Sequence, residues 1–226
     1  MTPEAAASLR RSAAHVVVDD VSVPALGDAD AHHVFRVLRI GDGAVVSVTD
    51  GRGAWRLCRA VGSSVEPVGE VAVEQPVTTP TTIGFAIPKM DRPEWIVQKL
   101  TELGVDRVVL LHAERSVVRW VEPRAAKHLA KLARVAVEAA QQCRRVFVPE
   151  VVGPVPSLSF LPSAVAAEPG ERPDRDGDHI VAIGPEGGWT ERELAAAADR
   201  ASLGPTVLRV ETAALVAAAR RYRHTA

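Results

Sequence analysis

The hydrophobic pattern of this chain changes near residues 74–82, and that change constrains the fold more than any other feature of the sequence. Residues 15–75 hold short valine-rich segments separated by turn residues, which predicts β-strands together with one short helix at 28–40. Proline and threonine in EQPVTTPTT are typical of an extended linker. Beyond it, strand and helix patterns alternate, as in a parallel sheet with helices on both faces. We therefore expect a small β-barrel over residues 1–75 and an α/β domain over residues 76–226.

Individual elements can be predicted from the same patterns. Asp50-Gly51, between two valine-rich runs, predicts a hairpin because both residues tolerate positive φ. Asp91, Pro93 and Gly104 favour the start and the end of a helix. In the second domain we expect strands at 82–88, 106–113, 146–151, 179–184 and 205–210, and helices at 91–104, 122–145, after Thr190, and at 211–223. The polar segment EPGERPDRDGDH, residues 168–179, predicts a mobile loop.

A strand, a glycine-rich turn and a helix start follow one another in IGPEGGWTERE, residues 183–193. Thr190 and Glu193 have the spacing of a capping box. Ligands of open α/β sheets bind at such turns, beyond the carboxyl ends of the strands. Neither GxxxxGK[ST] nor GxGxxG is present, and the carboxylate of Glu186 would repel a phosphate, so a ligand with a cationic or neutral head fits better. Taken alone, the pattern also allows a plain tight connection, and Trp189 either a core or a lid position.

Composition excludes several classes of protein. The formal net charge is -1, so an anionic partner would have to meet a local basic patch. Cys58 and Cys143 lack CxxC spacing, and His32 and His33 lack partners at metal spacing, so neither a disulfide framework nor a bound metal is expected. The first residues have no apolar core of a signal peptide, and no stretch is long enough to span a bilayer. These features predict a cytoplasmic protein without a membrane partner.

Over almost its whole length, the chain resembles the RsmE-type 16S ribosomal RNA uridine-N3 methyltransferases of the SPOUT superfamily. IGPEGGWTERE and LGPTVLRVETA look like the two C-terminal signatures of that family, although the second alone would read as a core strand and a helix cap. HHVFRVLRIGDG, KMDRPEWIVQKLTELGV and EAAQQCRRVFVPE resemble earlier motifs in the same order. Gln141 and Arg144 depart from the pattern, which usually has glutamate and a small residue there.

This resemblance implies a PUA-like β-barrel followed by a SPOUT α/β domain with a C-terminal trefoil knot. It also implies S-adenosylmethionine as the cofactor, 16S rRNA of the small (30S) subunit as the substrate, and a homodimer with the active site near the subunit interface. Glycines let the main chain approach the adenosine, and apolar side chains form its walls. The implied cofactor-binding residues are Ala167, Ile183, Gly184, Glu186, Gly187, Gly188, Leu203, Val207, Leu208 and Thr212.

Methylation at N3 of uridine requires loss of the N3 proton, so a base or a stabilised uridine anion is needed. Glu138 and Glu211 are candidate bases, and Arg145 and Arg209 are candidates to stabilise negative charge. Each is equally an ordinary helix-surface or helix-terminal charge when taken alone. The candidate RNA contacts, any one of which could be only a solvated cation, are Arg36, Arg39, Lys89, Arg92, Lys99, Arg115 and Arg144.

Three alternatives stay open at this level. The chain could be an RNA-binding protein that kept the SPOUT fold but lost turnover, or a methyltransferase with a different RNA target. It could also be another α/β enzyme that uses a nucleotide. Binding of S-adenosylmethionine, compared with binding of NAD or ATP, separates these alternatives.

Overall fold

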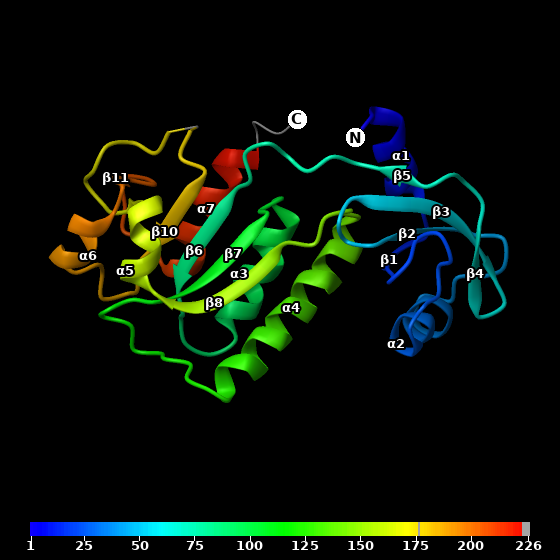
Figure 1. Cartoon of the computed structure of the whole chain (residues 1–226), viewed down its shortest axis with the longest axis horizontal. Coiled ribbons are helices and arrows are strands. Elements are labelled where there is room, and N and C mark those ends of the chain that lie inside the picture. The colour runs from blue at the N-terminus through cyan, green and yellow to red at the C-terminus, as the bar shows by residue number, and fades with distance from the viewer. Residues whose placement is uncertain (176, 223–226) are drawn as a thin grey trace. The chain divides into compact units, whose positions relative to one another are not determined.

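The computed structural model describes residues 1–175 and 177–222, which form two compact units. Unit 1 comprises Met1–Val77 and Val137–Val148, and unit 2 comprises Thr78–Ala136 and the chain from Pro149 onward. The long helix α4, Arg124–Cys143, contributes to both (Figure 1). The chain passes from unit 1 to unit 2 within the proline- and threonine-rich segment at 74–82; the domain boundary between residues 75 and 76 stays a prediction.

Unit 1 is built on a five-stranded sheet in the order β1-β2-β3-β4, with β5 also paired to β3. The predicted hairpin is confirmed, because β2 and β3 pair antiparallel with Thr49 opposite Trp55. Alternate residues of these strands, including Val46, Val48 and Cys58, are buried in one core. The elements are α1 Pro3–Arg11, β1 Ala14–Val17, α2 Asp28–His32, the π-helical turn His33–Val37, β2 Val45–Thr49, β3 Ala54–Val61, β4 Ser64–Pro67 and β5 Ala72–Val73.

The segment that follows α4 completes unit 1. The amide of Gly53, at φ 112°, donates to the carbonyl of Val146 at 3.0 Å. Only glycine fits there, because a Cβ would lie 2.6 Å from the carbonyl oxygen of Glu74. The buried imidazole of His15 contacts the Arg145 carbonyl oxygen through Nε2 at 3.2 Å, and burial lowers the pKa of His15 to about 4. Residues 145–148 therefore pack with unit 1, although they form no strand of its sheet.

Unit 2 is built on a six-stranded sheet in the order β11-β9-β10-β6-β7-β8, in which all neighbouring strands are parallel. The predicted parallel sheet is thus confirmed. Its elements are β6 Thr82–Ala86, α3 Arg92–Glu102, β7 Arg107–His112, α4, β8 Glu150–Pro156, α5 Ser157–Phe160, a 3-10 turn Leu161–Ser163, β9 Val165–Ala167, β10 Ile180–Ile183, α6 Glu191–Ala196, β11 Asp199–Ala201 and α7 Val210–Tyr222.

Helices cover both faces of this sheet, as predicted. On one face, α7 packs against α3, β6 and β10. On the other, α5, α6 and the 3-10 turn between them cover the sheet, and a core of small and branched side chains lies beneath them (Figure 1). This core includes Ala86, Leu111, Ala182 and Trp189. Gly84 belongs to the same face, where a Cβ would lie 2.5 Å from the ring of Phe160. Small residues on the central strands therefore let α5 approach closely.

Several predicted elements are wrong. Residues 205–209 form no strand, and Val210 is already the first residue of α7, so this extended segment pairs with no neighbouring strand among the described residues. The strand predicted at 146–151 begins only at Glu150, because Val148 instead donates its amide to Gly51 of unit 1 at 2.9 Å. Asp91 stands at the N-cap of α3 but makes no side-chain cap bond. The predicted end of the last helix, residue 223, lies outside the described residues.

Membrane-spanning helices and the trefoil knot are the two remaining subjects of prediction. None of the helices within residues 1–175 and 177–222 is long and apolar enough to cross a membrane. The trefoil knot stays a prediction.

Candidate functional site

A cavity of about 190 Å³ lies in unit 2 beyond the carboxyl ends of β9 and β10. It is larger than the roughly 150 Å³ cavity that admits a benzene ring, so a flat heterocycle fits the space. Its position agrees with the rule that ligands of parallel sheets bind beyond the strand ends. The cavity is lined by Ala167, Glu168, Pro169, Ile183, Gly184, Pro185, Glu186, Gly188, Trp189, Ser202, Leu203, Gly204, Thr206, Val207, Leu208, Val210 and Ala213.

The first wall of the cavity is the glycine turn that joins β10 to α6, residues 184–188. Gly188 adopts φ 70°, and its amide donates to the carbonyl of Pro185 at 2.9 Å. Arg115 holds the turn from outside, because its Nη1 donates to the carbonyls of Gly187 at 3.1 Å and Trp189 at 3.0 Å. These bonds occupy outward carbonyls, so the turn keeps one shape while its inner backbone faces the cavity.

The helix that follows the turn begins with the predicted capping box, which the structure confirms. Thr190 Oγ1 accepts from the amide of Glu193 at 3.2 Å, and the Glu193 carboxylate accepts from the amide of Thr190 at 2.9 Å. The fully buried carboxylate also accepts from Ser157 Oγ at 2.6 Å and from the amide of Glu114 at 2.9 Å. Burial by itself would raise the pKa of Glu193, but these hydrogen bonds outweigh it and lower the pKa below its ordinary value. One carboxylate thus joins the ends of β7 and β8 to the glycine turn.

The second wall consists of the segment after β9, starting at Ala167, and the bend after β11, residues 202–208. The amide of Glu168 donates to the carbonyl of Ala201 at 3.0 Å, so the two segments continue side by side past the strand ends. Ser202 Oγ donates to the carbonyl of Gly204 at 2.8 Å and closes the bend. Apolar side chains of Leu203, Val207 and Leu208 complete this wall.

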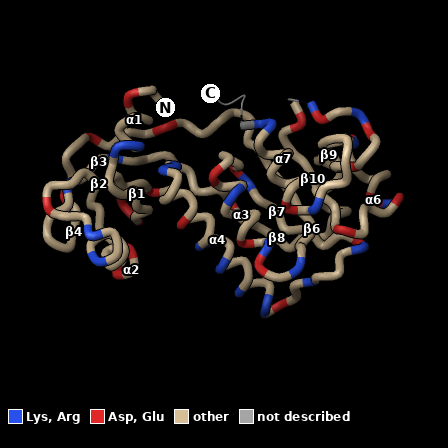
Figure 2. Tube along the Cα trace, turned by 180° about the vertical axis from the view of Figure 1, so that it is seen from behind, with Lys and Arg blue, Asp and Glu red and all other residues tan. Residues whose placement is uncertain are grey.

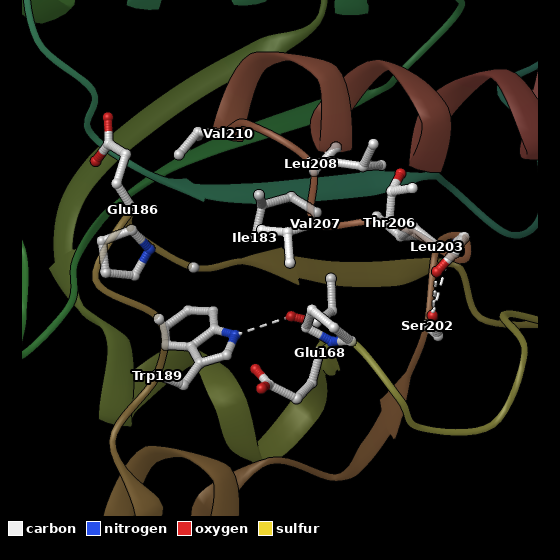
Figure 3. Close-up of a pocket in the computed structure, with 17 residues that line it drawn as sticks. Glu168, Ile183, Glu186, Trp189, Ser202, Leu203, Thr206, Val207, Leu208 and Val210 are labelled. Atoms are coloured by element: carbon white, nitrogen blue, oxygen red, sulfur yellow. Dashed lines mark hydrogen bonds between the residues drawn. The ribbon is translucent and has the colours of Figure 1, made fainter.

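Trp189 connects the two walls. It is buried, and its indole Nε1 donates to the carbonyl of Ala167 at 3.2 Å (Figure 3). Of the two positions considered for Trp189, core packing is the one observed. Figure 3 also shows Ile183, Val207 and Leu208 on the opposite side of the cavity from Trp189. A Cβ on Gly184 would lie 3.0 Å from the indole ring, so glycine lets the turn rest on the tryptophan.

The charge of the cavity is acidic. Glu168 and Glu186 line it, and no lysine or arginine does so among the described residues. Burial, followed by the neighbouring charge of Glu171, raises the pKa of Glu168, while Arg200 opposes the shift. A cavity of this composition disfavours phosphate groups and favours a ligand that carries positive charge.

Of the predicted catalytic residues, Arg209 and Glu211 lie in unit 2 beside the cavity-lining residues Leu208 and Val210. Glu211 Oε1 lies 3.8 Å from Nε of Arg92, whose Nη1 lies 3.7 Å from Oε1 of Glu186. The second oxygen of Glu211 is buried and has no hydrogen-bond partner within the described residues. Arg209 is exposed. Glu138 and Arg145 belong to unit 1, where Glu138 is exposed in α4 and Arg145 is half-buried.

The predicted cofactor-binding residues gather at this one cavity. Its lining includes Ala167, Ile183, Gly184, Glu186, Gly188, Leu203, Val207 and Leu208. Gly187 and Thr212 fall outside the lining, the first beside Arg115 and the second exposed in the first turn of α7. Sequence reasoning did not assign the other lining residues to the cofactor; they are Glu168, Pro169, Pro185, Trp189, Ser202, Gly204, Thr206, Val210 and Ala213. Their closeness in sequence to the glycine turn and to the bend at 202–208 could have indicated several of these residues. The direction in which their side chains point could not be predicted.

The predicted RNA contacts are divided between the units, and Figure 2 shows basic and acidic residues interspersed in both. In unit 1, Arg36 and Arg39 are exposed, and Arg144 donates to the carbonyl of Ser12 at 2.8 Å. In unit 2, Lys89 is exposed, while Lys99 pairs with Glu102 at 2.7 Å. Arg92 and Arg115 are engaged at the glycine turn, as described above.

Sequence reasoning also missed a basic stripe on α4. Arg124, Lys127, Lys131 and Arg134 are exposed and follow helical spacing along one face. Lys131 pairs with Glu94 at 2.6 Å. The spacing of three and four residues was visible in the sequence, but the exposure of that face was not.

Comparison with known proteins agrees with this geometry. A family model described as an RNA methyltransferase domain matches residues 74–221, and one described as an RNA methyltransferase PUA domain matches residues 26–60. A Mycobacterium bovis protein named ribosomal RNA small subunit methyltransferase E is 34% identical over 88% of this chain and 86% of its own length.

Solved structures are similar over nearly the whole chain. A probable rRNA-methyltransferase from Porphyromonas gingivalis has 30% identity and a TM-score of 0.73, covering 94% of this chain and 97% of that one. A ribosomal RNA small subunit methyltransferase E from Neisseria gonorrhoeae, bound to S-adenosyl methionine, has 25% identity and a TM-score of 0.74, covering 91% and 95%.

Proposed function

We propose, from the premise that this chain belongs to the RsmE family of RNA methyltransferases, that it methylates N3 of a uridine in 16S rRNA with S-adenosylmethionine as methyl donor. Membership confirms the predicted fold, a PUA-like β domain followed by a SPOUT-type α/β methyltransferase domain. The cavity between the glycine turn and the bend at 202–208 carries the proposal, because its chemistry suits an adenosyl sulfonium compound.

The residues present fit this cofactor. Apolar side chains of Ile183, Leu203 and Leu208 offer walls for an adenine ring, and the turn at 184–188 offers backbone amides and carbonyls for its polar edge. The carboxylates of Glu168 and Glu186 complement a positively charged ligand. When bound, the cofactor supplies an electrophilic methyl group on a sulfonium. The chain itself positions that group, which is where most of the catalytic effect of such a transfer arises.

The acceptor nitrogen must lose its proton before it can attack. Glu211 is our preferred base, because it stands in the first turn of α7 next to the cavity and one carboxylate oxygen is buried without a partner in the described chain. Arg92 lies between Glu211 and Glu186, at 3.8 Å and 3.7 Å from their carboxylate oxygens, and its positive charge complements both carboxylates. Arg209 is placed to stabilise the negative charge that develops on the uridine oxygens. Glu138 and Arg145 remain candidates for the same roles.

RNA must be held by local cations, since the net charge is -1. We propose that the basic stripe on α4 contacts phosphates together with Arg36, Arg39 and Lys89, all of which are exposed. Replacing Arg124, Lys127 and Arg134 by glutamine should weaken RNA binding and reduce the dependence of log Kd on log salt by about two to three units. An unchanged salt dependence in a filter-binding assay would remove the stripe from the interface.

Two further properties belong to the proposal. We expect a homodimer with the active site near the subunit interface, and a cytoplasmic location, where ribosomal subunits are assembled. Analytical ultracentrifugation of the purified chain tests the first expectation. A sedimentation coefficient of a monomer at micromolar concentration would contradict it.

Mass mapping of rRNA tests the function directly. Small subunits from a strain that lacks the family's enzyme are incubated with the protein and isotope-labelled S-adenosylmethionine, and the 16S rRNA is digested to nucleosides. We expect labelled N3-methyluridine, and none when Glu211→Gln replaces the wild-type protein. Cofactor binding without transfer to naked 16S rRNA or to subunits would instead favour a non-catalytic RNA-binding protein, and label at another nucleotide a different RNA target.

A further inference from the structure

Residues 168–179 were predicted to form a mobile loop, yet Asp174 in this loop is bonded to the C-terminal end of α7. Asp174 is buried, with 2% of its side chain exposed, and it faces Arg221, whose side chain is 3% exposed. The guanidinium binds both carboxylate oxygens, Nη2 to Oδ1 at 2.8 Å and Nη1 to Oδ2 at 3.1 Å. This bidentate pair joins residues 47 positions apart in the sequence.

Arg221 is itself held in place from both sides. Its Nη1 also donates to the carbonyl of Ala217 in α7 at 2.6 Å, and its Nε donates to the carbonyl of Asp178. The neighbouring Arg220 donates from Nη2 to the carbonyl of Leu203 at 2.8 Å, and Leu203 lines the cavity. The last turn of α7 therefore binds both segments of the second wall, the segment after β9 and the bend at 202–208.

Main-chain hydrogen bonds connect these contacts to residues that line the cavity. The amide of Asp174 donates to the carbonyl of Ser202 at 3.1 Å, and the amide of Ser202 donates to the carbonyl of Arg172 at 2.7 Å. Ser202 lines the cavity, and so does Glu168 at the start of the same segment. Displacing Asp174 would thus break its main-chain hydrogen bond to Ser202, and the second wall would become less ordered.

We propose that Asp174 and Arg221 are positioning residues that preorder the second wall of the cavity for the cofactor, through the pairing of Asp174 with Ser202. The inference rests on the proposed function for the identity of the ligand. Neither side chain lines the cavity, so the pair acts on the fraction of molecules whose wall is formed. If a variant lowers that fraction to about a tenth, the apparent Kd for the cofactor rises about tenfold.

Removing Asp174 leaves the buried charge of Arg221 without a carboxylate, and removing Arg221 leaves Asp174 with only the longer ion pair to Arg220 at 3.6 Å, whereas removing both charges leaves neither buried group charged. This difference between the single variants and the double variant distinguishes a positioning role of the pair from a general loss of stability. Asp174→Asn and Arg221→Gln should each raise the Kd for S-adenosylmethionine about tenfold. The double variant Asp174→Asn/Arg221→Gln should bind more tightly than either single variant, since amide groups can still hydrogen-bond. Arg175→Gln, at the exposed position next to Asp174 in the same segment, is the matched control and should bind like wild type.

Isothermal titration of the full-length chain with S-adenosylmethionine measures all five proteins, and steady-state assays add a second readout. We expect KM for the cofactor to rise while kcat at saturating cofactor stays near wild type, because the pair touches neither the cavity nor the RNA candidates. If Arg221→Gln does not fold, Arg221→Lys replaces it, since lysine keeps the charge but loses the bidentate fork.

Folded single variants with wild-type Kd, or additive losses in the double variant, would overturn the pairing role. A wild-type protein that fails to bind S-adenosylmethionine would instead refute the proposed function itself, so the two failures are distinguished.

Discussion

The two walls of the cavity are held by different means. The glycine turn combines contacts close in sequence, such as the capping box of Thr190 and Glu193 and the bond from Gly188 to Pro185, with two hydrogen bonds from the distant Arg115. The second wall is fixed by charged groups that come from distant parts of the chain, above all Asp174 and Arg221. The local part of the first wall is therefore readable from a short stretch of sequence, whereas its distant contacts and the whole of the second wall depend on the completed fold.

This difference predicts different responses to substitution. Changes at the glycine turn should alter the stability of unit 2 directly, because the turn rests on Trp189 and on the buried Glu193 carboxylate. Changes at the second wall should also act on ligand affinity, because its contacts order two segments that line the cavity. The substitutions below test that contrast, from the largest expected effect to the smallest.

The largest effect is expected for Glu193→Ala. Its carboxylate accepts bonds from Ser157 Oγ and from the amides of Thr190 and Glu114, and all three donors would be left unpaired. We expect a loss of about 3 kcal/mol or more in unfolding free energy, measured by urea denaturation. Glu191→Ala, exposed in the same helical turn, should cost less than about 1 kcal/mol. Equal losses for the two variants would show that the buried carboxylate does not join the strand ends.

The dependence of the unfolding free energy on pH should also reveal the contribution of the Glu193 carboxylate. Since the folded-state pKa of Glu193 is lowered, its contribution to stability is present above the ordinary glutamate pKa and is lost as the pH falls through the lower folded value. Glu193→Gln should therefore flatten the loss of stability below about pH 4.5. A stability profile parallel to that of the wild type would contradict this assignment.

Substitution of glycines compares the two walls directly. A Cβ on Gly184 would lie 3.0 Å from the ring of Trp189, so Gly184→Ala should cost about 1–3 kcal/mol of stability. A Cβ on Gly204 would meet nothing within 4 Å, so Gly204→Ala should leave stability within about 0.5 kcal/mol. Because Gly204 lines the cavity, that added methyl should still weaken cofactor binding. Thermal unfolding and calorimetry together separate the two effects; a destabilised Gly204→Ala would erase the contrast.

A smaller effect is expected at the outer face of the turn. Arg115→Ala removes the bonds to the carbonyls of Gly187 and Trp189, but both carbonyls can then bind water. We expect a cost of about 1 kcal/mol in stability and a several-fold weaker affinity for the cofactor. Lys89→Ala, at an exposed position, should leave both quantities unchanged. If Arg115→Ala weakens only RNA binding, the guanidinium serves the substrate and not the turn.

The smallest effect concerns Glu168. Its pKa is raised by burial and by Glu171, so its negative charge is lost at a higher pH than that of an ordinary glutamate. The affinity for a cationic cofactor should therefore fall as the pH is lowered through that pKa, by about two- to fivefold for a partly exposed carboxylate. Glu168→Gln should show the low-pH affinity at every pH. Calorimetry from pH 4.5, the ordinary glutamate pKa, up to about pH 7.5 measures this change.

The features that could be predicted from the sequence are those that depend on local patterns, as in the comparison of the two walls. The hairpin at Asp50-Gly51 and the capping box were predicted from local patterns, and the cluster of Ile183, Gly184 and Leu208 around one cavity was predicted from the family resemblance. The segment at 205–209 was predicted as a strand because its valines and leucine suit one, but it pairs with no strand among the described residues.

Pairs of distant residues could not be predicted at all. A carboxylate in a polar loop reads as solvated, and only the folded chain shows that Asp174 is buried against Arg221. The partners of Glu193 after β7 and in α5 are hidden for the same reason, since burial of a charged side chain depends on elements that meet only in the completed sheet.

Crystals of the protein grown with saturating S-adenosylmethionine test the account most directly. We expect density for the adenosyl group between the glycine turn and the side chains of Leu203 and Leu208, with the sulfonium methyl directed toward Glu211. Density at another place on the chain, or none at concentrations that saturate related enzymes, would contradict the assignment of this cavity.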